Sequence, residues 1–459
     1  MFNSATGWIL GFGAIALVWV SLLIKRGPKA ALGAAVAISF PFPVWVEQDI
    51  AGIPFTVRTA ICCLAMLGYA FHPRGKIISP LTLLDLCIAL ICLNHILVDT
   101  YVSGFSVATP LLAYGEWALP YVAGRYAVKT EEDLKFIAPW VVCGLVLISI
   151  CVMVESLTDI NVFEVLFGKR PVVLGHPMGR RFGIRRAFGP TTHSLFLGML
   201  LVVMMPWLLC LWKSAKNNAQ RLLLSGASLL SAVGCLCSIA RTPVITLALT
   251  LAVLTVIRRP MLRLPFVISV VSGIVAFLLF PNQITDSVSR WTGGGDKIRI
   301  IEVDGKAVEV SSSRSRLVVF SIYSEALSKG VAGYGSQALK TFPPQIPYIQ
   351  GKKNNADVKP IDNGYILMTL RFGWIGGLLF LIMFLTAIFS VVLLYREHSG
   401  SLFLASLGSL YAVIAFFSML LVWMSYDFGL PILWTFGCLS GLTSTSILNR
   451  RPLSQSFKR

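Results

Sequence analysis

The chain has 459 residues, of which 56% are hydrophobic and only 13% are charged, and its mean hydropathy is +0.77. About a quarter of the residues of an average soluble domain are charged, so the composition excludes a soluble globular protein. The net charge is +18, from 39 lysines and arginines against 21 aspartates and glutamates. Because the basic residues stand in blocks between apolar runs, membrane topology explains them and nucleic acid is not an expected partner.

Apolar runs recur along the whole chain, and the long ones approach the roughly 20 residues that cross a bilayer. We therefore predict an all-α polytopic membrane protein with about 12 or 13 transmembrane helices. The number stays open because prolines interrupt the second span and the fifth span is polar. The predicted spans are residues 7–24, 30–46, 56–71, 81–97, 108–127, 136–155, 190–212, 222–240, 243–257, 264–280, 374–395, 401–423 and 428–447.

The short loops after every odd-numbered span are rich in lysine and arginine, which is typical of loops that face the cytoplasm. The N-terminus is then predicted to lie outside and the C-terminus inside. The chain divides into N-terminal transmembrane helices, a basic outer loop, central transmembrane helices, a long outer loop, and C-terminal helices with a cytoplasmic tail. These segments are residues 1–155, 156–189, 190–280, 281–363 and 364–459.

The outer loop of residues 156–189 is short, yet it is strongly basic on the side where the positive-inside pattern predicts few lysines and arginines. Two interpretations stay open. The loop binds something anionic outside the membrane, or it is a solvated loop that is tolerated because the other loops fix the orientation. Asp159 and Glu164 oppose its basic residues, which are Lys169, Arg170, Arg180, Arg181, Arg185 and Arg186.

Arginines also stand at the predicted outer ends of three spans, at Arg58, Arg241 and Arg371. A planar guanidinium group binds phosphate oxygens in pairs and does not deprotonate. Beside the basic loop, these arginines are candidates for a diphosphate pocket; the alternative is that each extends its head group to the interface. Arg125 lies at the cytoplasmic end of its span, and we expect it to have a structural role.

The long outer loop contains recognisable elements. Residues 297–303 and 306–310 flank Asp304-Gly305, a pair suited to a type I′ turn, so a small β-hairpin is expected. A helix is predicted from Ser313 to Gly330, with Arg314 and Arg316 in its first turn. Positive residues there oppose the helix dipole, and an anionic ligand would offset that cost. Phosphate-loop, dinucleotide and metal-binding motifs are absent from the sequence.

The order and sidedness of several short motifs between about residue 180 and residue 400 resemble the bacterial O-antigen ligase and polysaccharide polymerase family. The resemblance implies a GT-C-like fold in the bacterial inner membrane. It also implies glycosyl transfer on the periplasmic face, from a polyprenyl-diphosphate-linked oligosaccharide to a glycan or lipid-linked acceptor. The matching motifs are Arg186-Ala-Phe-Gly-Pro-Thr-Thr-His193, Ser238-Ile-Ala-Arg241, Arg314-Ser-Arg316, Gly333-Tyr-Gly335, Asp362-Asn363-Gly-Tyr365 and Arg371-Phe-Gly-Trp-Ile-Gly376.

Carried over by position, the family roles place diphosphate binding on Arg241 and Arg316, with Asp362 where the family has a histidine as base. Asp362 is a departure, because an aspartate is ordinarily a weaker base than a histidine. His193 is a second candidate base, although a lone histidine at a span entrance is more often structural. The resemblance implies inverting, metal-independent transfer without a cofactor. Further predicted substrate-binding residues are Arg186, Arg185, Arg181, Arg314, Arg371, Asn363, Tyr365 and Arg58.

Polymerase and ligase differ in their acceptor, and the Gly-Pro-x-x-His run before a span favours a polymerase, with an O-antigen ligase acting on lipid A-core as the alternative. A transporter or flippase is a rival interpretation; it would place ionisable residues at mid-depth, where only Asp85 and Glu116 lie well inside spans. We expect Glu116 to pair with an arginine inside the bundle. A third alternative is a non-catalytic subunit of a polysaccharide assembly system, which the aspartate at position 362 supports.

Overall fold

The computed structural model describes residues 4–50, 53–73, 79–170, 180–181, 184–280, 283, 299–303, 306–310, 332–336, 363–398 and 400–450. Within this part, nine helices are long and apolar enough to cross a membrane, which confirms the predicted polytopic all-α class. These helices are α1 (Ser4–Arg26), α4 (Leu83–Ser103), α7 (Glu131–Thr158), α9 (Ser194–Met204) continued by α10 (Pro206–Trp212), α11 (Asn218–Cys237), α12 (Arg241–Arg258), α17 (Gly364–Glu397), α18 (Leu402–Phe416) continued by η3 (Ser418–Leu420), and α19 (Tyr426–Arg450).

The other four predicted spans are also helical in the described residues, but each is shorter than these nine or is interrupted. The causes are local: Pro41 and Pro43 follow the end of the second helix, and a π-helical turn divides the fifth. These helices are α2 (Pro28–Ser39), α3 (Val57–Phe71), α5 (Ala108–Ala113) with η1 (Tyr114–Ala118) and α6 (Leu119–Ala127), and α13 (Arg263–Leu279), which follows the short η2 (Pro260–Leu262).

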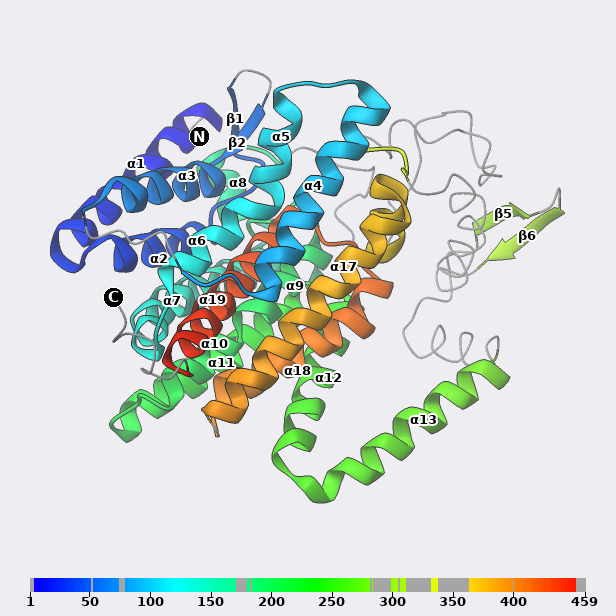
Figure 1. Cartoon of the computed structure of the whole chain (residues 1–459). Coiled ribbons are helices and arrows are strands. Elements are labelled where there is room, and N and C mark those ends of the chain that lie inside the picture. The colour runs from blue at the N-terminus through cyan, green and yellow to red at the C-terminus, as the bar shows by residue number, and fades with distance from the viewer. Residues whose placement is uncertain are drawn as a thin grey trace, which may run out of the picture.

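The helices form one bundle with α19 in its interior, while α13 projects away from it (Figure 1). α19 crosses α6 closely because glycines face the partner backbone. A Cβ on Gly437 would lie 1.9 Å from the carbonyl oxygen of Tyr121, and one on Gly124 would lie 2.0 Å from that of Trp434. Small residues at such crossings allow backbones to approach and gain packing energy in a membrane protein.

The two ends of the bundle differ. At one end the short basic loops meet, as shown by the ion pairs of Lys29 with Asp133 at 2.8 Å and of His398 with Glu131 at 3.0 Å. The other end, here called the outer end, holds Arg58, Asp159, Arg186, Arg241 and Asn363, and the positive-inside pattern predicts that it faces away from the cytoplasm. It also carries the hairpin of β1 (Glu47–Ile50) and β2 (Ile53–Thr56), α8 (Val162–Phe167), and the short strands β3 (Arg180–Arg181) and β4 (Ile184–Arg185).

The predicted β-hairpin of the long loop is present as β5 (Arg299–Val303) and β6 (Lys306–Val310). The strands are antiparallel, and Val303 pairs with Lys306, so a two-residue connection joins them as the Asp-Gly pair indicated. The helix predicted from Ser313 to Gly330 lies outside the described residues.

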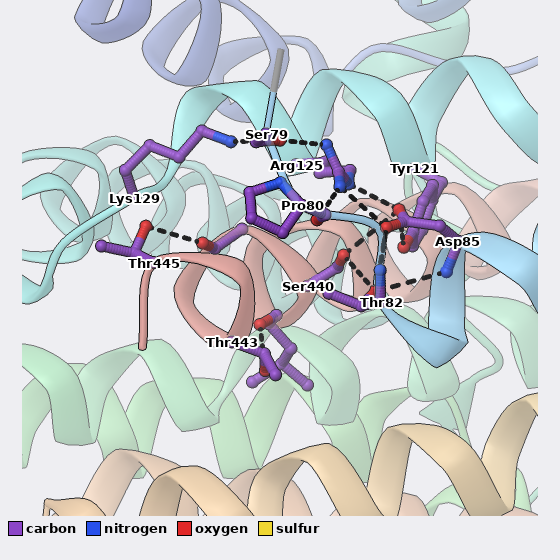
Figure 2. A network of polar contacts seen from close by, with 12 residues as sticks. Ser79, Pro80, Thr82, Asp85, Tyr121, Arg125, Lys129, Ser440, Thr443 and Thr445 are labelled. Carbon is purple, nitrogen blue, oxygen red and sulfur yellow. Dashed lines mark hydrogen bonds and ion pairs between the residues drawn. The ribbon is translucent and has the colours of Figure 1, made fainter. Parts of the chain in front are cut away.

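A buried ion pair ties α4 to α6 near the basic end (Figure 2). Arg125 donates through Nη2 to Oδ2 of Asp85 at 2.8 Å, and Tyr121 donates to Oδ1 at 2.7 Å. Thr82 and Asp85 form the capping box of α4, and the Ser440 hydroxyl of α19 donates to Asp85 at 3.3 Å. The predicted structural role of Arg125 is confirmed, because its guanidinium group neutralises a carboxylate inside the bundle.

Lys129 lies in the loop beside this network, and its side chain is half-buried. Its Nζ lies 3.4 Å from the Ser79 hydroxyl and 4.9 Å from the centre of the Tyr126 ring. Burial, and then repulsion from Arg125, lowers the pKa of Lys129 to about 8. We expect its acylation by an amine reagent, followed by mass spectrometry, to rise about tenfold per pH unit below that pKa and then to level off. A rate that keeps climbing to pH 10 would contradict this.

Candidate functional site at the outer end

The segment of residues 186–193, here called the outer turn, leads from the basic loop into α9. The carboxylate of Glu155, 1% exposed near the end of α7, accepts the backbone N–H of Phe188 at 3.1 Å and that of Gly189 at 2.8 Å. Gly189 has a φ of +52°, and a Cβ there would lie 2.9 Å from the Leu197 side chain. The outer turn is therefore fixed to α7 by a buried carboxylate and a position that requires glycine.

A second buried carboxylate holds the other half of the outer turn. Asp427, in the first turn of α19, accepts the backbone N–H of Thr192 at 3.1 Å and its hydroxyl at 2.8 Å. The Ser425 hydroxyl donates to the same carboxylate at 3.0 Å. The outer turn is thus held between α7 and α19, which are far apart in the sequence.

Arg186 and His193, which flank the outer turn, make local contacts. Arg186 donates through Nη2 to the Ser194 hydroxyl at 2.7 Å. His193 is the N-cap of α9, and its Nδ1 accepts the backbone N–H of Leu195 at 3.1 Å. A neutral imidazole whose Nδ1 accepts must carry its proton on Nε2. His193 in this state can donate a hydrogen bond through Nε2 but has no free nitrogen to take a proton.

Arg241 begins α12 directly beside the outer turn. The backbone N–H of Ala187 donates to the Cys237 carbonyl at 3.1 Å, which joins the turn to the end of α11. Between the two helices, Ile239 has a φ of +47°, a conformation that is strained for a β-branched residue. Such strain persists only where surrounding structure enforces it, and it is frequent at functional sites. The tight reversal therefore sets the direction in which α12 presents Arg241.

The start of α17 reaches the same end of the bundle. Asn363 is its N-cap: Oδ1 accepts the backbone N–H of Ile366 at 3.1 Å, and Nδ2 donates to the Leu420 carbonyl at 3.2 Å. Tyr365 donates its hydroxyl to the Ala415 carbonyl at 2.6 Å. These contacts give Asn363 and Tyr365 structural roles. Asp362 precedes Asn363 in the chain but lies outside the described residues.

Arg371 forms a bidentate pair with Glu116 from η1. Its two terminal nitrogens donate to the two carboxylate oxygens at 3.1 and 3.2 Å. The expected pairing of Glu116 with an arginine is confirmed. The predicted binding of substrate by Arg371 would compete with this pair, because the guanidinium nitrogens that bind Glu116 are the ones that would bind a phosphate.

Arg58 is fully buried, and its position corrects the prediction of a substrate-binding arginine. Its guanidinium group donates to the carbonyl oxygens of Phe40 at 2.6 Å, Phe42 at 2.9 Å and Asp427 at 2.8 Å. Both phenylalanines follow the end of α2, where carbonyl groups no longer find a partner within the helix, and Arg58 supplies the donors. Arg58 is a structural crosslink, and we leave it out of the proposed site.

The basic loop is partly neutralised by acidic residues. Arg170 lies 3.7 Å from Glu164, Arg180 pairs with Asp159, and Arg185 lies 4.0 Å from Glu155 and also donates to the Asp159 carbonyl. In the described part of the loop, three of the basic residues therefore have an acidic neighbour, while Lys169 and Arg180 are exposed. Predicted residues outside the description are Arg314, Arg316 and Asp362, together with the side chain of Arg181.

The sequence interpretation missed the two carboxylates that hold the outer turn. Glu155 is the last residue of one predicted span, and Asp427 directly precedes another, so each stands at the edge of an apolar run. A signal was available: a carboxylate at the edge of an apolar run needs a partner, because an unpaired buried charge is costly. Among the described residues, His, Cys, Asp and Glu form no group that could hold a metal ion.

Apolar helices in one bundle, with arginines and ordered loops gathered at one end, define a polytopic membrane protein whose candidate site lies near the membrane surface. Residues 226–381, about a third of the chain, match the family model described as O-antigen ligase. This region is therefore similar to the O-antigen ligase family, in agreement with the resemblance that the sequence motifs indicated. No curated protein matches the chain.

Proposed function

We propose that the protein transfers an oligosaccharide from a polyprenyl diphosphate to a hydroxyl group of an acceptor sugar. The reaction would take place on the periplasmic face of the bacterial inner membrane and would extend an exopolysaccharide or O antigen. The observation that supports the proposal is the outer turn, which carries Arg186 and His193, is held by two buried carboxylates, and is hydrogen-bonded to the end of α11 just before Arg241. Arg241 also lies within the region that matches the family model.

The charge of the leaving group explains why arginines are needed. The diphosphate gains negative charge as the glycosidic bond breaks, and preorganised donors at that place lower the barrier. Arg241 and Arg186 would supply these donors, with Arg316, Arg314, Arg185 and Arg181 as further proposed ligands. A lipid diphosphate also explains how an activated sugar donor would reach the outer face, because such a donor can cross the membrane with its leaving group attached.

Asp362 is the proposed base, and His193 the proposed hydrogen-bond donor. His193 uses Nδ1 to cap α9, so accepting a proton would require it to give up that cap. A carboxylate can accept the proton of an acceptor hydroxyl when the bond to the leaving group breaks first. A single displacement would invert the configuration of the transferred sugar, and the proposed arginines make a metal unnecessary. Asn363 and Tyr365 would act by holding α17 in place.

The test is to incubate the purified protein in nanodiscs with a lipid-linked oligosaccharide, and to analyse the products by gel and mass spectrometry. We expect longer glycan on the lipid, and the same yield when a chelator is present. Transfer to lipid A-core without lengthening would identify a ligase instead of a polymerase. If neither acceptor receives sugar, while vesicle assays show the intact donor crossing the bilayer, the protein is a flippase and the proposal fails.

A further inference from the structure

A kink in α17 provides binding positions for another part of the chain. Phe372 has φ −126° and ψ 18°, and Gly373 has φ 69° and ψ −172°, both outside the helical region. In a regular helix the carbonyls of Leu370 and Arg371 would accept N–H groups four residues later. Here the Leu370 carbonyl accepts the backbone N–H of Tyr334 at 2.7 Å, and the Arg371 carbonyl accepts that of Gly335 at 2.8 Å.

The next N–H of the same segment is bound by a carboxylate from a third part of the chain. Asp99, 8% exposed near the outer end of α4, accepts the backbone N–H of Ser336 through Oδ1 at 2.6 Å. Three consecutive N–H groups, at residues 334, 335 and 336, are therefore all bonded. A Gly-x-Gly segment whose N–H groups are occupied in this way cannot cradle a phosphate.

Both glycines of the segment are required by the contact. Gly333 has a φ of +65°, and a Cβ there would lie 2.5 Å from the backbone nitrogen of Gly373. Gly335 has a φ of +78°, and a Cβ there would lie 2.9 Å from Asp99 Oδ1. Only glycine combines these backbone angles with so close an approach. The segment is thus shaped for the kink and for Asp99.

The receiving surface is itself well ordered. His95 Nε2 lies 3.3 Å from Asp99 Oδ2, while the indole N–H of Trp117 donates to His95 Nδ1 at 3.2 Å. Asn94, also on α4, donates to the Phe372 carbonyl at 3.1 Å, within the kink. α4 and α17 are therefore joined at the point where the loop segment binds, and the buried imidazole of His95 lies beside the Asp99 carboxylate.

We propose that Asp99 and the α17 kink anchor the long outer loop, and that Asp99 is a positioning residue for the transfer reaction. The anchored segment, residues 333–336, lies between Arg316 and Asp362 in the sequence, so both parts of the loop that carry proposed site residues start from one fixed point. The positioning role of Asp99 rests on the proposed function, whereas the anchoring of the loop rests only on the contacts described above. Misplacement of reacting groups by about 1 Å can cost about 100-fold in rate.

The anchor is tested without any activity, by hydrogen–deuterium exchange of the backbone in nanodiscs. Asp99→Ala should speed exchange across residues 333–336 by about tenfold or more, because the N–H groups open to solvent. Asp99→Asn keeps an acceptor oxygen and should retain most of the protection. Tyr101→Ala, at an 80% exposed position on the same helix, is the matched control and should change nothing. Unchanged exchange in Asp99→Ala would overturn the anchor, whatever the protein catalyses.

The positioning role is tested by replacing the hydrogen bond with a covalent link. Asp99→Cys should lower kcat for glycan transfer by about tenfold or more, and Asp99→Asn should keep most of it. Adding Ser336→Cys and oxidising the pair should restore kcat, and reduction should lower it again. If the oxidised pair shows protected exchange but stays inactive, Asp99 does more than position the loop and this role is wrong. If the native protein transfers no glycan, the proposed function fails and the exchange result still decides the anchor.

Discussion

Arg241→Ala is expected to abolish glycan transfer while leaving the protein folded in the membrane. Arg241 begins α12 at a strained reversal that joins the outer turn, where a developing diphosphate charge would need a fixed cation. Loss of one such donor costs about 100- to 1,000-fold in kcat in other enzymes. The measurement is the rate at which lipid-linked oligosaccharide is converted to longer glycan, at saturating donor.

Two companion variants make the Arg241 result specific. Arg241→Lys keeps the charge but not the planar fork, so an intermediate rate is expected. Arg259→Ala removes an exposed arginine at the opposite end of the same helix and should leave the rate near that of the native protein. Equal membrane levels and thermal stability of all three show that folding is not the cause. Full activity of Arg241→Ala would remove the core of the proposed mechanism.

Asp85→Ala is expected to give the largest loss of stability. Asp85 and Arg125 are 11% and 5% exposed, and removal of the carboxylate leaves a guanidinium group buried without its counter-ion (Figure 2). Breaking a buried pair in this way costs about 3–5 kcal/mol, because the remaining charge stays desolvated. The free energy of unfolding, measured by denaturation in detergent micelles, should fall by that order.

The matched control is an ion pair at the same end whose lysine is exposed. Lys29 and Asp133 are 2.8 Å apart, but Lys29 is 39% exposed, so Lys29→Ala should cost about 0–1 kcal/mol. The double variant Asp85→Leu with Arg125→Met removes both charges together and should recover much of the lost stability. Similar losses from Asp85→Ala and Lys29→Ala would show that burial does not govern the energetics of these pairs.

Local patterns in the sequence predicted most of the secondary structure. Length and apolarity locate the spans, since a helix that crosses hydrocarbon must satisfy its own backbone. Asp304-Gly305 predicted the hairpin of the long loop, because the turn chemistry acts over a few residues. The expected pairing of Glu116 followed from a general rule: a charge inside a membrane protein needs a counter-charge or a polar contact. Apolar composition does not reveal where a helix is interrupted, as the π-helical turn between α5 and α6 shows.

The sequence by itself determined the membrane class, the alternation of basic loops and the similarity of residues 226–381 to the family model. Only the tertiary structure decided what the polar residues do. Arg58 donates a hydrogen bond to the carbonyl of Asp427, which lies 369 residues further along the chain. Thr192 donates to the carboxylate of the same residue, which lies 235 residues further along. The spacing of residues in the sequence does not reveal such partners. A buried donor can be satisfied by any acceptor that folding brings within about 3 Å, wherever that acceptor stands in the sequence.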